Sequence, residues 1–68
     1  MGEQEPKCYV VVTTDDTVGA VIKYDEPEKN ELVVVHFHEE NGSKLRVKLR
    51  VKYVLDVYDI QQFYLQGW

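Results

Sequence analysis

The stretch SKLRVKLRVKY, residues 43–53, alternates between basic and apolar side chains from Lys44 to Lys52. Successive side chains of a β-strand point to opposite faces of the sheet, so this alternation predicts a strand with one basic and one apolar face. The basic set is Lys44, Arg46, Lys48, Arg50 and Lys52, and the apolar set is Leu45, Val47, Leu49 and Val51.

Three upstream segments also have strand composition, and turn-forming residues separate them. Thr14, Asp15 and Asp16 indicate a turn, and the charged segment 25–30 with Pro27 indicates a loop. In the segment after the first turn the even-numbered residues are apolar, and in the next segment Val33, Val35 and Phe37 share a face. The predicted strands before residue 44 are 8–13, 17–24 and 31–38.

The hairpin before the basic strand contains Asn41-Gly42, a strong turn signal. A two-residue turn would set Phe37 opposite Arg46 and bury a basic side chain. A three-residue loop, 40–42, instead sets Phe37 opposite Leu45, with Gly42 supplying the left-handed residue. We therefore predict the three-residue loop. Its cross-strand pairs are Glu39–Ser43, His38–Lys44, Phe37–Leu45 and His36–Arg46.

The C-terminal part leaves two arrangements open. Residues 54–58 have the composition of a fifth strand, and Asp59 is a candidate cap for a short helix over 60–64. Alternatively, this aromatic tail lies extended across the barrel. Because the ending FYLQGW is unusually apolar for an exposed tail, we expect it to pack on the barrel, on a second subunit or on a partner.

These elements predict an all-β domain, either a small four- to five-stranded antiparallel meander or a barrel, with or without a short C-terminal helix. The chain of 68 residues is long enough for one domain. We assign residues 1–7 to a disordered N-terminus, 8–58 to the barrel and 59–68 to the aromatic tail.

Two apolar segments carry a family resemblance. Val18-Gly19-Ala20-Val21, followed by Val33-Val34-Val35-His36-Phe37 and a later strand ending in Val54-Leu55, resembles the SH3-like small-barrel superfamily over residues 8–58. The resemblance implies an SH3-like fold. That superfamily includes peptide binders, tudor-type readers, ribosomal modules and docking subunits of redox complexes, so the resemblance does not select a function.

Composition narrows the function classes. The formal net charge of -4 argues against a general affinity for nucleic acid. The single cysteine, Cys8, cannot form a disulfide within the chain and is typical of a reducing compartment. No apolar run approaches the roughly 20 residues of a membrane span, and the start has no apolar signal region. We expect a cytoplasmic protein without membrane contact.

The outer face of the third and fourth strands is the candidate binding surface. Five of the eight Lys and Arg residues lie in its row of cations. At about 6.7 Å between residues two apart on a strand, the row would be about 27 Å long. A merely solvated face is the alternative, and the sequence leaves both open. The candidate residues are Lys44, Arg46, Lys48, Arg50, Lys52, His36, His38, Leu32 and Val34.

An acidic protein surface is the expected partner, attracted by the cations and contacted by Leu32 and Val34. A nucleic-acid accessory barrel using the same face is the alternative. It is less favoured because the even positions of these strands carry no Phe, Tyr or Trp on which bases would stack. A third hypothesis is a structural homodimer joined through the aromatic tail, so the chain is expected to be a monomer or a homodimer.

The sequence predicts neither catalysis nor a cofactor. His36, His38 and Glu40 share one strand face, but the neighbouring cations would repel a metal ion. Cys8 has no His or Asp at a recognisable catalytic spacing, and we expect an inert, partly buried thiol. No phosphate-binding loop or nucleophile motif is present. We expect a non-catalytic interaction module.

Overall fold

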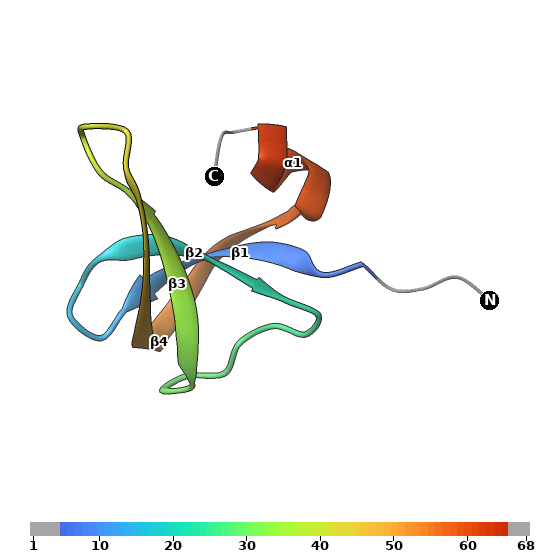
Figure 1. Cartoon of the computed structure of the whole chain (residues 1–68). Helices are drawn as coiled ribbons and strands as arrows, with labels where there is room; N and C mark the ends of the chain where they lie inside the picture. The colour runs from blue at the N-terminus through green and yellow to red at the C-terminus, as the bar shows by residue number, and fades with distance from the viewer. Residues whose placement is uncertain (1–4, 66–68) are drawn as a thin grey trace.

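The computed structural model describes residues 5–65 as four antiparallel strands followed by a short helix (Figure 1). The strands form a closed barrel in the order β1-β2-β3-β4, with β4 paired back to β1. The predicted all-β meander with a short C-terminal helix is confirmed. The elements are β1 (Lys7–Thr13), β2 (Val18–Lys23), β3 (Leu32–His38), β4 (Lys44–Asp59) and α1 (Ile60–Leu65).

The long strand β4 belongs to two ladders in succession (Figure 1). Its first part pairs with β3 as far as Arg50, and its second part pairs with β1 from Val51 to Asp59. The β1–β4 register shifts between Val10 and Val11 and again between Val12 and Thr13. Such bulges bend a strand and increase its twist, which carries β4 from one neighbour to the next. Residues 54–58 therefore continue the fourth strand, and the alternative of a separate fifth strand is wrong.

The β3–β4 hairpin has the predicted three-residue loop. The Glu39 amide donates to the Ser43 carbonyl at 2.9 Å, and the Gly42 amide donates to the Glu39 carbonyl at 3.0 Å. Gly42 has a φ of 86°, in the left-handed region where glycine carries no steric penalty. Phe37 is opposite Leu45, so the register deduced from the apolar pattern is confirmed.

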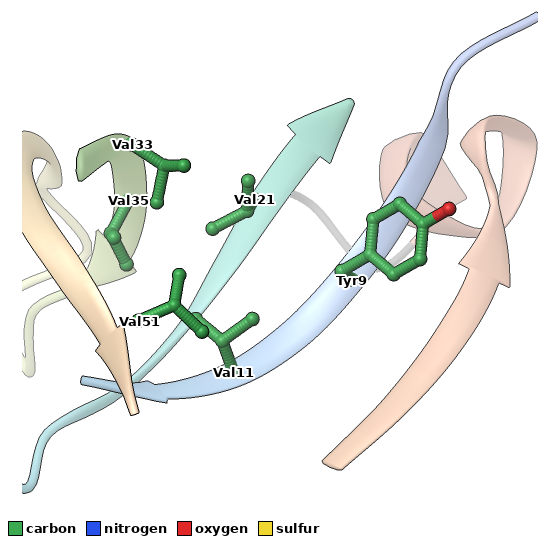
Figure 2. Packing of buried hydrophobic residues seen from close by; sticks show 6 residues of the cluster. All are labelled: Tyr9, Val11, Val21, Val33, Val35 and Val51. Atoms are coloured by element: carbon green, nitrogen blue, oxygen red, sulfur yellow. The ribbon is translucent and has the colours of Figure 1, made fainter. Parts of the chain in front are cut away.

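The barrel interior is filled mainly by valines from all four strands. Figure 2 shows Val33 and Val35 of β3 beside Val21 of β2, with Val11 and Val51 below them and Tyr9 farther along β1. Phe37, Leu49 and Val54 pack against this cluster while remaining partly exposed. Leu45 lies on the inward side of β4 but is 44% exposed, because β2 pairs with β3 no farther along the hairpin than His36.

The barrel closes between β2 and β3 through a narrow contact. Among the described residues, the pair Ala20–His36 is the one β2–β3 bridge. A Cβ on the neighbouring Gly19 would overlap Cγ1 of Val35 and would lie 2.8 Å from Cε1 of Phe37. Gly19 is therefore required by the close approach of β3, since a larger residue would push the two strands apart.

A second apolar cluster lies outside the barrel, beneath α1. Cys8, Ala20 and Phe63 are its buried members, and Ile22, Tyr58 and Ile60 pack around them. The apolar even-numbered positions of the second predicted strand thus divide: Ala20 and Ile22 lie against the helix cluster, whereas Val18 and Tyr24 are exposed. Of the expected aromatic tail, Phe63 packs on the barrel, and Trp68 lies outside the described residues.

Candidate binding face

The predicted basic row runs along the outer side of β4. Within the β3–β4 ladder its cations lie beside the even-numbered residues of β3, as the hairpin register requires. We use the term basic face for the outer residues of these two paired segments. The cross-strand pairs of the basic face are Leu32–Arg50, Val34–Lys48, His36–Arg46 and His38–Lys44.

Residues of two turns contact the cations at one end of the row. Lys52 lies beyond the β3 ladder, and its Nζ forms an ion pair with Oδ1 of Asp16 at 2.8 Å. The hydrogen bond and the charge of Asp16 raise the pKa of the Lys52 ammonium. Nη1 of Arg50 donates to the Asn30 carbonyl at 2.8 Å. The β1–β2 turn and the β2–β3 loop thus hold the last two cations in place.

The other three cations have no such partner among the described residues. Lys44, Arg46 and Lys48 are exposed, and none of them forms an ion pair with a residue in the range 5–65. Two strand intervals of about 6.7 Å give this triplet a length of about 13 Å. Like charges at this spacing repel one another in water by a few tenths of a kcal/mol per neighbouring pair. An acidic group placed over the triplet would relieve that repulsion.

Aliphatic surface borders the triplet on β3. Leu32 is 53% exposed and Val34 is 41% exposed, and both lie directly across from cations of β4. The structure therefore brings together the predicted basic and aliphatic residues on one face. Lys52 is the exception, because the ladder ends before it and Asp16 holds its charge.

His36, a candidate residue of the outer face, is only partly exposed. Phe63 of α1 covers it, with ring centroids 5.7 Å apart and ring planes at 75°. The strand alternation correctly placed His36 on the outer face, but it carried no information about which later segment would pack there. Phe63 reaches it because Ala20, the β2 partner of His36, is small and belongs to the cluster beneath the helix.

Partial burial lowers the pKa of the His36 imidazole, and the nearby Arg46 guanidinium lowers it further. The unfolded chain, in which histidine titrates near pH 6.5, then binds more protons than the folded chain in the range just below that value. Stability contributed by neutral His36 is therefore complete above about pH 6.5 and is lost as the pH falls below it.

We expect the free energy of unfolding of the natural chain, measured by urea denaturation, to decrease between about pH 6.5 and 5. His36→Gln is expected to reduce that slope, whatever its effect on stability at pH 7. The hydrogen-bonded carboxylates of Asp15 and Glu31 have lowered pKa values, so their protonation changes stability at a more acidic pH than that of His36 does. An unchanged slope in His36→Gln would contradict the burial of neutral His36 under α1.

A groove of about 380 Å³ separates α1 from the start of the basic face. Ile22, His36, Phe63 and Tyr64 supply its apolar and aromatic lining, and Lys44 and Arg46 supply its charge. Sequence reasoning identified His36 and the two cations but missed Ile22, Phe63 and Tyr64. The apolar even positions of residues 18–24 were the available signal, since an apolar outer face requires a cover.

The described residues show no arrangement typical of a metal or nucleophile site. Within residues 5–65, no group of three or more His, Cys, Asp or Glu side chains is placed to hold a metal ion. Cys8 is buried beneath α1, and burial raises the pKa of its thiol, which is opposite to the shift that activates a cysteine. In this part of the chain, α1 is too short to cross a membrane.

No protein-family model matches the chain, and neither the curated proteins nor the solved structures include a significant match to it.

Proposed function

We propose that this protein is a non-catalytic interaction module that docks to an acidic protein surface through the basic face. The observation that supports the proposal best is the exposed triplet Lys44, Arg46 and Lys48, which has no acidic partner in residues 5–65 although the chain is acidic overall. Complementary charge accelerates encounter and selects the orientation of docking. An acidic partner would therefore be steered to this face.

The aliphatic residues of the basic face add a short-range contribution. Leu32 and Val34 present apolar area beside Arg50 and Lys48. Burying apolar surface contributes roughly 25 cal/mol per Å² before the costs of association. A partner that carries acidic residues around an apolar centre would match both properties of the face.

A nucleic-acid accessory barrel is the second candidate, and one observation favours it. Tyr64 is 69% exposed and lines the groove beside Lys44 and Arg46, so an aromatic side chain does border the cations. Bases of a single strand stack on such side chains. A nucleic-acid strand would extend past the triplet to the acidic turns of this chain of net charge -4, and we rank this candidate second.

The SH3-like fold and the homodimer through the aromatic tail are also proposals. We propose an SH3-like barrel, and the closed four-stranded meander with a close β2–β3 crossing at Gly19 supports it. The lone Cys8 supports a reducing, cytoplasmic setting. A homodimer through the tail has less support, because Phe63 is buried within its own chain.

The relative affinity for two acidic ligands separates the first two candidates. Fluorescence anisotropy with a labelled polyglutamate and a labelled oligothymidylate is expected to show tighter binding of polyglutamate, weakening as salt rises from about 50 to 200 mM. Screening of the exposed triplet is the physical reason. Tighter binding of the oligothymidylate would favour the second candidate, and no salt-sensitive binding of either would contradict both.

A further inference from the structure

We infer that the groove between α1 and the basic face anchors one large apolar side chain of the acidic partner, whose neighbouring carboxylates lie over the β4 cations. This inference rests on the proposed docking function and specifies the segment that would be recognised. The groove volume of about 380 Å³ falls in the range of about 300–1,000 Å³ that small-molecule pockets occupy, so it can accept a side chain.

The groove is apolar along the α1 side. Ile22 comes from β2, and Phe63 and Tyr64 come from α1. The Phe63 and Tyr64 rings lie edge to face, with centroids 5.4 Å apart and planes at 74°. Phe63 is buried, so Tyr64, which is 69% exposed, offers most of this aromatic surface to a further ring or a large aliphatic group. A small inorganic anion would leave these walls unused.

The groove is cationic along the β4 side. Arg46 and Lys44 line it, and neither forms an ion pair with another described residue. An arginine can hold a carboxylate through two parallel hydrogen bonds, which also fixes orientation. His36, half-buried between the two sides, adds no full charge in its neutral form. The ligand chemistry implied is therefore an apolar body with carboxylates on one side.

The position of Lys48 gives the bound segment a direction. It lies two residues beyond Arg46 on the same face, about 6.7 Å farther from the groove. An extended acidic segment would place carboxylates two residues apart over Arg46 and Lys48, with its apolar side chain in the groove. Aliphatic Val34, which pairs with Lys48, would contact the same segment.

Two matched peptides test the inference. Both are short labelled polyglutamates, one with a central phenylalanine and the other with a central serine. We expect the phenylalanine peptide to bind about tenfold more tightly, since partial burial of the ring is worth about 1.4 kcal/mol. Tyr64→Ala is expected to remove most of that difference while leaving the serine peptide unaffected. Tyr24→Ala, an exposed tyrosine outside the groove, is the control.

The outcomes distinguish the inference from the proposed function. Equal, salt-sensitive binding of the two peptides would overturn the anchor site and leave the docking function standing. Failure of both peptides to bind would overturn the docking function as well. If an oligothymidylate binds more tightly than either peptide and loses affinity in Tyr64→Ala, the groove is a base-stacking site and the inference is wrong.

Discussion

Gly19→Ala is expected to lower the free energy of unfolding by about 2–3 kcal/mol, within the usual range for overpacking a filled core. The added Cβ would overlap the buried Val35 side chain and would lie 3.0 Å from the His36 carbonyl oxygen. Val35 is β-branched and fully buried, so it has little freedom to move aside. At about 0.05–0.15 kcal/mol per residue, the total free energy of unfolding of a chain of 68 residues is only about 3–10 kcal/mol.

Urea denaturation followed by circular dichroism measures this loss. Val18→Ala is the matched control, because Val18 precedes Gly19 on β2 but is exposed, and we expect it to change stability by less than about 1 kcal/mol. A Gly19→Ala protein as stable as the natural chain would mean that β2 and β3 do not approach closely, and the barrel would then be open at this point.

The double substitution Arg46→Glu with Lys48→Glu is expected to weaken binding of acidic polyglutamate about a hundredfold at low salt. Each tenfold step corresponds to about 1.4 kcal/mol, and two exposed attractions of about 0.7 kcal/mol become repulsions of similar size. The same protein should lose most of its salt dependence. Neither side chain is buried, so the thermal unfolding midpoint should change little.

A control with the same change of net charge is Lys7→Glu with Lys29→Glu. Both lysines are exposed and lie outside the basic face. We expect this control to lose less than about tenfold in affinity for polyglutamate, because it changes only the long-range field of the whole protein. If the two double variants lose affinity equally, net charge alone governs binding and the basic face has no special role.

Local pattern was sufficient for the strands and for the hairpin register. The alternation of Lys44–Lys52 allowed one choice of inner face, and Phe37 could join that face only through a three-residue loop ending at Gly42. The continuity of β4 was not predictable in the same way. Its bend depends on bulges against β1, which is distant in sequence, and no local signal marks them.

For the candidate face, the sequence predicted only which side chains of the two strands share the outer side. Parity placed the four cations within the ladder beside the even-numbered residues of β3, and the structure has them there. The ion pair between Lys52 and Asp16 depends on the β1–β2 turn. The contact of Phe63 with His36 depends on α1. Both elements are distant in sequence from the residues that they contact. The apolar even positions of residues 18–24 indicate a covered outer face but not which segment covers it, so the groove beside α1 was missed.

The most direct test of docking through the basic face is amide chemical-shift mapping by NMR while the polyglutamate peptide with central phenylalanine is added. Docking there predicts shifts concentrated in residues 44–48, at His36 and in α1, with little change in the second half of β4 at residues 53–57. Shifts confined to residues 53–57, or spread evenly over the barrel, would contradict it.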